Sequence, residues 1–148
     1  MSEAPLTRSW RARYGECDQQ GVVFNAHYLA WFDDDMTELW RAAFGSYEAA
    51  VERGIEIVVA ESHLRYRASV RFDELVQIEV AVTHMGNTSL TTHHSVTRDG
   101  AVLVEGTLRH VIVDPQTLSK KPMPDWFRAG LAQFAGDAYL GSGSLPGQ

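Results

Sequence analysis

One stretch of the sequence gathers several chemically active groups just before the expected start of a helix. A thiol, a carboxylate, an amide and an imidazole stand close together at Cys17, Asp18, Asn25 and His27. Glycines bracket the acidic part of this stretch, and a helical pattern of apolar residues follows it. The first turn of a helix has backbone N–H groups without internal partners and carries partial positive charge. A carboxylate beside such donors is an arrangement that catalysis can use.

Each of these groups also has a plain structural interpretation. Asp18 can close an Asx turn in its own loop, and Asn25 can cap the helix by accepting from N–H groups of the first turn. A cysteine nucleophile needs a fixed histidine and a third group to orient it. The sequence shows no such set, so Cys17 reads as a small loop residue. His27, on the first helical turn, reads as a polar or packing residue.

The surrounding residues predict one long helix among extended segments. Apolar residues recur at steps of three and four over 26–44, which predicts a helix there. Its expected apolar face consists of Leu29, Phe32, Met36, Leu39, Trp40 and Ala43. The aspartates at 33–35 are expected on its solvated face. Further patterns predict strands over 6–14, 55–67, 71–84, 90–98 and 101–113, and short helices over 47–53 and 126–134.

The order of these segments predicts the fold class. Hairpin signals at Gly86-Asn87 and Asp99-Gly100 favour antiparallel pairing. A long helix with an apolar face must bury it against one face of that sheet. We therefore expect a single α+β domain over residues 1–135, with a curved five-stranded antiparallel sheet around a central helix. The Gly- and Ser-rich residues 136–148 are expected to form a flexible tail.

Bulk composition narrows the function classes. The chain has 148 residues and a formal net charge of −6, which argues against binding nucleic acid or a membrane surface. Its one cysteine excludes an internal disulfide and suits a reducing compartment. No apolar run reaches the ~18 residues of a membrane helix, and the N-terminus lacks signal-peptide features. We expect a cytoplasmic protein. The histidines show no ligand spacing, and the neighbours His93 and His94 must face opposite ways on a strand, so no metal site is expected.

The opening stretch resembles a known family. Its motif reads Tyr14-x-x-x-Asp18-x-x-Gly21-Val22-Val23-x-x-x-x-Tyr28-x-x-Trp31-Phe32. This motif and the order of elements are similar to the hotdog-fold acyl-CoA thioesterases, in particular the 4-hydroxybenzoyl-CoA thioesterase type. Segments 51–55, 66–75 and 94–98 agree more loosely, and the likeness covers residues 6–135.

The resemblance implies a site and a reaction. The acid at the position of Asp18 is the family's catalytic carboxylate, acting as a nucleophile or as the general base for water. Backbone N–H groups near the helix start, here from Phe24 to Ala26, polarise the thioester carbonyl, and Asn25 orients them as a cap. The substrate is an acyl-CoA, and since coenzyme A is part of that substrate, no cofactor is needed. The family works as homodimers or homotetramers whose active sites lie between subunits.

Other residues are assigned to substrate binding on the same grounds. Gly21, Phe24 and Tyr28 belong to the motif. Coenzyme A carries phosphates, and Arg65, Arg67 and Arg71 could form a basic rim for them, unless they are an ordinary solvated strand end. His63 is placed against the neighbouring subunit's pocket.

The sequence departs from the family pattern in places, and alternatives stay open. Many relatives carry histidine where Asn25 stands; asparagine cannot transfer protons, and His27 is the nearby substitute. Some hotdog thioesterases place the acid on the helix, which makes Asp34 or Asp35 an alternative to Asp18. A hotdog dehydratase or hydratase would need a His/Asp or His/Glu pair that the sequence does not show. A non-catalytic acyl-thioester-binding protein is the remaining alternative.

Overall fold

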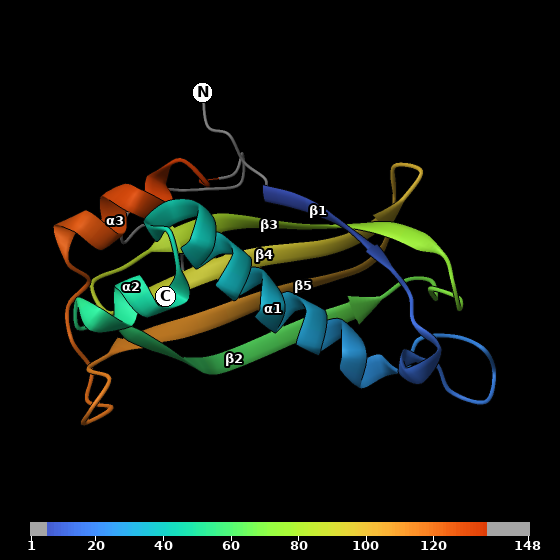
Figure 1. Ribbon diagram of the computed structural model, residues 1–148, viewed down its shortest axis with the longest axis horizontal. Coiled ribbons are helices and arrows are strands. Elements are labelled where there is room, and N and C mark those ends of the chain that lie inside the picture. The colour runs from blue at the N-terminus through green and yellow to red at the C-terminus, as the bar shows by residue number, and fades with distance from the viewer. Residues whose placement is uncertain (1–5, 136–148) are drawn as a thin grey trace.

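The computed structural model describes residues 6–135, and residues 136–148, predicted as a flexible tail, lie outside this part of the chain. The strands are β1 (Leu6–Arg11), β2 (Glu56–Tyr66), β3 (Leu75–Met85), β4 (Ser89–Arg98) and β5 (Ala101–Val113). The helices are a 3-10 turn η1 (Tyr14–Glu16), α1 (Asn25–Phe44), α2 (Tyr47–Glu52) and α3 (Asp125–Ala132). The strands pair antiparallel in the order β1-β3-β4-β5-β2 (Figure 1). The predicted α+β architecture is confirmed.

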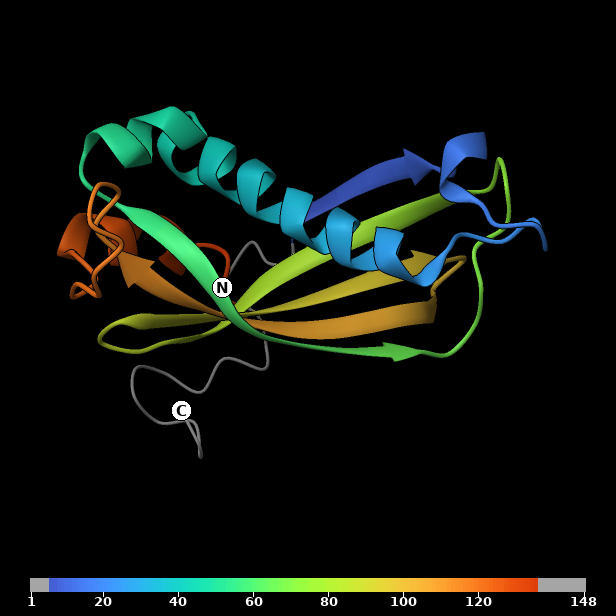
Figure 2. The same ribbon diagram turned by 90° about the horizontal axis from the view of Figure 1, so that it is seen from below.

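The long helix α1 lies across one face of the sheet, and the sheet curves around it (Figure 2). Helices α2 and α3 sit at the end of α1 farthest from its N-terminus (Figure 1). The opposite face of the sheet, which we call the outer face, carries no helix from residues 6–135 (Figure 2). None of the helices within residues 6–135 has the length and apolar character to cross a membrane.

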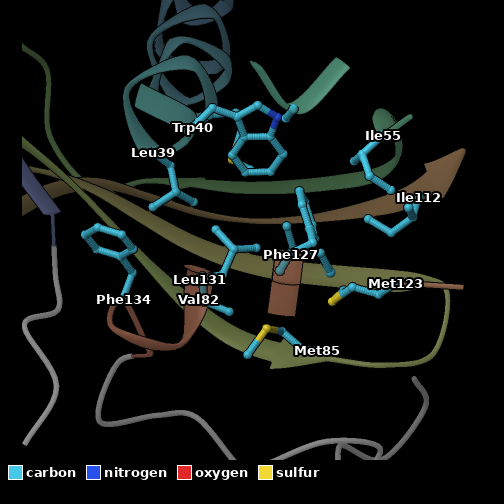
Figure 3. Close-up of a cluster of buried hydrophobic side chains, with 13 residues drawn as sticks. Leu39, Trp40, Ile55, Val82, Met85, Ile112, Met123, Phe127, Leu131 and Phe134 are labelled. Carbon is cyan, nitrogen blue, oxygen red and sulfur yellow. The ribbon is translucent and has the colours of Figure 1, made fainter. Parts of the chain in front are cut away.

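Two buried clusters hold α1 to the sheet. The first joins the C-terminal half of α1 to α3 and the sheet, and Figure 3 shows Trp40 and Phe127 facing into it. The second joins the N-terminal half of α1 to the middle of the sheet, with Trp31 and Phe32 at 2% and 0% exposure. Burial on this scale is the main source of stability in such a domain. The half of α1 that begins at the acidic loop is therefore firmly seated.

The buried stripe of α1 is turned relative to the predicted one. Leu29, expected in the core, is 37% exposed, whereas Tyr28, Trp31 and Asp35 are buried. Phe32, Met36, Leu39 and Trp40 are buried as predicted. The prediction was wrong at Leu29 and Asp35, because the apolar stripe is wide and burial of an aspartate is costly unless a partner compensates it. Asp35 has two such partners, Arg8 and His94.

Strand β3 starts later than predicted. Residues 71–74 form a turn instead, closed by the Glu74 N–H donating to the Arg71 carbonyl oxygen (3.2 Å), with Asp73 at φ 67°. Strand β2 lies at one edge of the sheet and contains a bulge at Ala60, since Val59 pairs with His110 while Glu61 pairs with Arg109. At the bulge, the alternation of side chains between the two faces of the sheet shifts by one residue, and the sequence pattern did not predict this shift.

Candidate active site

The acidic loop is a short closed structure at the end of the sheet opposite α3 (Figure 1). Cys17 and Val23 form an isolated bridge, and the Asp18 N–H donates to the Val22 carbonyl oxygen (2.9 Å). Gly21 lies at φ 77°, a conformation that favours glycine. The backbone of Gly21 lets the loop turn back on itself, and its role in substrate binding stays a prediction.

Only one of the two carboxylate oxygens of Asp18 has a hydrogen-bond partner among residues 6–135. Its Oδ1 accepts from the Gln20 N–H at 2.8 Å, which is the Asx turn that the sequence offered as an alternative. Its Oδ2 has no hydrogen-bond partner among residues 6–135, and the residue is exposed. The Asx turn and an active carboxylate are therefore compatible, because the turn fixes one oxygen and leaves the other open.

The start of α1 differs from the prediction. Phe24, not Asn25, is the N-cap, and no side chain caps the helix. The Phe24 N–H donates to the Glu16 carbonyl oxygen (2.9 Å), so it is not available to a substrate. Asn25 and Ala26 are the first residues of the helix, where N–H groups have no partner within it. The predicted donors Phe24 to Ala26 thus reduce to the N–H groups of Asn25 and Ala26.

A hollow of about 600 Å³ opens beside Asp18. Two exposed aromatic rings form part of it, Tyr14 at 83% and Phe72 at 51% exposure, packed edge to face with centroids 5.9 Å apart. The rest of the lining comes from Gly15, Cys17, Asp18, Gln19 and Gly21. The Phe72 N–H donates to the Gly21 carbonyl oxygen (3.1 Å), so the turn at 71–74 is attached to the loop. Asp18 therefore borders a cavity with an aromatic wall.

Glu16 holds this region together, and this role was not predicted from the sequence. Its carboxylate accepts from the indole N–H of Trp31 (2.7 Å), the indole N–H of Trp10 (3.1 Å) and the Arg13 N–H (2.8 Å). Partial burial acts to raise the pKa of Glu16, but these donors, led by Arg13, outweigh burial and lower it. The sequence offered one signal for this role. Glu16 is a carboxylate two residues before Asp18, with Trp10 before it and Trp31 after it, and both indole N–H groups can donate to a carboxylate.

Tyr28 is not in the hollow. It is 2% exposed, and its hydroxyl oxygen accepts from the Val70 N–H at 3.1 Å. Its ring packs against Trp31 and Tyr66. Tyr28 therefore packs in the core of this chain, and its assignment to substrate binding stays a prediction, whereas Phe24 is 53% exposed beside the loop.

His63, Arg65 and Arg67 lie on the outer face of the sheet, away from α1. His63 and Arg65 line a separate hollow of about 320 Å³ with His93, Glu105, Gly106 and Thr107. Arg67 donates from Nε to Glu105 at 2.6 Å. Within one chain these residues do not join the Asp18 site. The backbone of Arg71, by contrast, bridges Val22 in the loop.

The other candidates have distinct environments. Slight burial and then the charges of Glu16 and Asp18 raise the pKa of the Cys17 thiol, so nothing activates it as a nucleophile. Burial is also the largest cause that raises the pKa of Asp34. Asp35 is 1% exposed, and both of its carboxylate oxygens are engaged, by Arg8 and by His94. Residues 6–135 contain no group of three His, Cys, Asp or Glu side chains placed to hold a metal ion.

Comparison with known proteins places this site in a family. The model of the thioesterase-like superfamily matches residues 12–131. Acyl-CoA thioester hydrolase YbgC of Escherichia coli O6:H1 is 30% identical over 115 residues, covering 77% of this chain and 86% of the relative. A hypothetical protein of Thermus thermophilus has a TM-score of 0.80 at 26% identity, over 90% of this chain and 99% of that one.

A gentisyl-coenzyme A thioesterase shares the fold, with a TM-score of 0.76 at 20% identity over 86% of this chain and 99% of that one. The family match covers the acidic loop, α1 and all strands from β2 to β5. The chain belongs to the thioesterase-like superfamily and is a thioester hydrolase of the hotdog-fold acyl-CoA thioesterase family.

Proposed function

We propose that the protein hydrolyses an acyl-CoA to the free acid and coenzyme A, with Asp18 as the catalytic carboxylate. The observation that carries this proposal is the open Oδ2 of Asp18, in a loop that runs directly into the unpaired N–H groups of α1. The Escherichia coli relative YbgC is named as an acyl-CoA thioester hydrolase. The reaction needs no cofactor, because coenzyme A enters as part of the substrate.

Two routes use the same atoms. In the first, Oδ2 attacks the thioester carbon, the carbon–sulfur bond breaks, and water hydrolyses the resulting mixed anhydride. In the second, Oδ2 takes a proton from a water molecule as that water attacks. In both, negative charge develops on the carbonyl oxygen, and the N–H groups of Asn25 and Ala26 stabilise it. One such donor contributes about 3 kcal/mol to lowering the barrier. The thiolate leaves readily, so no strong general acid is required.

A second copy of the chain would complete the site. Among residues 6–135, strand β2 has a neighbour on one side only and so forms an edge of the sheet, and its Val58 and Val59 are 40% and 48% exposed. An exposed apolar edge strand is a template for pairing with another strand. We propose a homodimer, with a homotetramer as the larger alternative, that joins the sheets through β2. Such pairing is the arrangement in which His63, Arg65 and Arg67 of one copy could serve the Asp18 site of the other.

The phosphates of coenzyme A require cations, and Arg71 is the basic residue whose backbone lies against the acidic loop. We assign Arg71, with Arg65 and Arg67 from the second copy, to the nucleotide end of the substrate. The single cysteine supports a reducing location, and we place the enzyme in the cytoplasm.

Thiol release from a panel of acyl-CoAs tests the proposal. The wild type is expected to hydrolyse at least one of them, and Asp18→Asn is expected to lose about 10³-fold or more in kcat, since asparagine neither attacks nor takes a proton. Asp34→Asn, which changes a neighbouring helix carboxylate, is the matched control. Wild-type turnover by Asp18→Asn would refute the assignment. Binding without hydrolysis across the panel would favour the non-catalytic acyl-thioester-binding alternative.

A further inference from the structure

The carboxylate of Glu16 has more donors than any other group around the acidic loop. Oε2 accepts from Trp31, and Oε1 accepts from both Trp10 and the Arg13 N–H. The Arg13 guanidinium lies over the Trp10 ring, 4.5 Å from its centroid, and so covers one side of this cluster. Hydrogen bonds to a charged acceptor are about twice as strong as neutral ones.

These bonds join separate parts of the fold. Trp10 belongs to β1, while Trp31 belongs to the second turn of α1 and is 2% exposed. The backbone of Glu16 makes a further link, because its carbonyl oxygen accepts from the N–H of Phe24, the N-cap of α1. Glu16 therefore contacts the residues on both sides of the segment 17–24 that carries Asp18. The two tryptophan rings also touch, with centroids 6.1 Å apart.

Only a carboxylate satisfies this arrangement. Two indole N–H groups and one backbone N–H all donate toward one side chain, so both of its oxygens must be acceptors. Glutamine offers one acceptor oxygen, and its NH₂ group would face a donor. A buried donor left without a partner costs about 1–3 kcal/mol. The tryptophans would then turn away or the loop would shift.

We propose that Glu16 is a positioning residue for thioester hydrolysis, which fixes the open oxygen of Asp18 relative to the N–H groups of Asn25 and Ala26. The inference rests on the proposed function of Asp18. Glu16 does not touch the substrate; it acts through Trp10, Trp31 and the backbone of Phe24. Its contribution is to hold two elements at a set separation, and a misplacement of about 1 Å in such a pair costs about 10²-fold in rate.

The test measures kcat and KM for Glu16→Gln, Trp31→Phe and the double variant, on an acyl-CoA that the wild type hydrolyses. Glu16→Gln is expected to lower kcat by about 10²-fold, with KM within a few-fold of the wild type. The double variant is expected to lose little more than Glu16→Gln alone, because both changes break the same bond. Glu38→Gln, an exposed carboxylate on α1 whose partner is Arg41 at 2.6 Å, is the matched control and keeps the wild-type kcat.

A second readout is independent of activity. Amide hydrogen exchange over residues 17–24 is expected to speed up in Glu16→Gln while the exchange of β4 and β5 stays unchanged. A folded Glu16→Gln with wild-type kcat, or losses in the two single variants that multiply in the double variant, would overturn the inference. If Glu16→Gln does not fold, Trp31→Phe and Trp10→Phe decide, and wild-type kcat in both would overturn it.

Asp18→Asn, run in the same series, separates the two proposals. Loss of activity in Asp18→Asn with normal activity in Glu16→Gln refutes only the role of Glu16. Normal activity in Asp18→Asn refutes the proposed catalyst, and the exchange result then still reports whether Glu16 orders the loop.

Discussion

His94 Nδ1 lies 2.8 Å from Asp35 Oδ2, and both side chains are buried in the contact between β4 and α1. On the other side of the ring, His94 Nε2 lies 2.7 Å from Thr92 Oγ1, which in turn lies 3.2 Å from His110 Nε2. The ionised aspartate can only accept, so His94 donates from Nδ1 and accepts from Thr92 through Nε2. His110 then donates from Nε2, which agrees with its Nδ1 having no hydrogen-bond partner among the described residues.

The spacing of Asp35, His94 and Thr92 is that of a catalytic triad, but its setting is structural. Their exposures are 1%, 0% and 0%, so no substrate reaches the hydroxyl group. At the aspartate end of this network, Arg8 donates to Asp35 Oδ1 at 2.9 Å and to the Trp31 carbonyl oxygen at 2.8 Å. The network ties β1, β4 and α1 together.

Asp35→Ala should therefore cost stability rather than chemistry. Removing the carboxylate leaves the Arg8 guanidinium and the His94 N–H without their partner, and breaking a buried pair in this way costs about 3–5 kcal/mol. The free energy of unfolding in urea measures the effect. Glu38→Ala, on an exposed position of the same helix, is the control and should cost under about 1 kcal/mol. An equally small loss in Asp35→Ala would show that the network contributes little.

Stability should fall in acid because of the buried histidines. Burial, and then the nearby His94, lower the pKa of His110 from 6.5 to about 3, and burial lowers the pKa of His94. Below pH 6.5 the unfolded chain binds protons that the folded chain does not. The stabilisation is thus complete above that pH and is lost as the pH falls toward 3, by up to about 1.4 kcal/mol per pH unit and per histidine.

Urea unfolding between pH 7 and pH 4 measures this slope in the wild type and in His110→Gln. The variant does not titrate at that position, so its free energy of unfolding should depend less steeply on pH. Parallel curves for the wild type and His110→Gln would contradict the prediction.

Two substitutions at one residue separate the backbone of Asn25 from its side chain. Asn25→Pro removes the N–H group, and proline is tolerated in a first helical turn, especially after an extended residue such as Phe24 (φ −70°, ψ 141°). Asn25→Ala removes the amide side chain and keeps the N–H. We expect kcat to fall about 10²-fold in Asn25→Pro and to change only a few-fold in Asn25→Ala. Equal losses would mean that the side chain, not the backbone, serves the reaction.

Val59→Lys should disrupt assembly of the proposed dimer. A lysine on an exposed edge strand opposes pairing with a second strand. Sedimentation at micromolar concentration is expected to show a monomer, and kcat/KM should fall with it because the proposed site draws residues from two copies. Leu75→Lys, on β3 at 50% exposure and paired with β1, is the control and should remain a dimer. A wild type that sediments as an active monomer would contradict the shared site.

The strands and the long helix were predictable because their patterns repeat. In the strand predicted over 71–84, the alternating residues Val76, Ile78, Val80 and Val82 are all buried, and His93 and His94 do face opposite sides. The role of Asp35 was not predictable, because its partners Arg8 and His94 come from distant strands that only the fold brings together.

The site was predictable in outline only. The motif placed Asp18 in a loop before the helix, and the structure has that loop. The motif could not show that the Phe24 N–H already donates to the Glu16 carbonyl oxygen, nor that Tyr28 points into the core. Backbone hydrogen bonds cannot be predicted from residue types, because nearly all residues carry the same backbone N–H and C=O groups. Burial of Tyr28 could not be predicted either, because an aromatic residue suits a core as well as a pocket.

Because of the bulge at Ala60, the effect of deleting a residue from β2 depends on where in the strand the deletion falls. On the two sides of the bulge, Val59 and Leu64 both face α1 although they are five positions apart, an odd number that plain alternation forbids. Losing a residue of β2 away from the bulge would turn one end of the strand over, putting Leu64 and His63 on each other's faces. Losing one residue at the bulge, such as Ala60, would leave the rest of the strand on its own faces and straighten the edge. Natural length variation in this strand should therefore concentrate at the bulge.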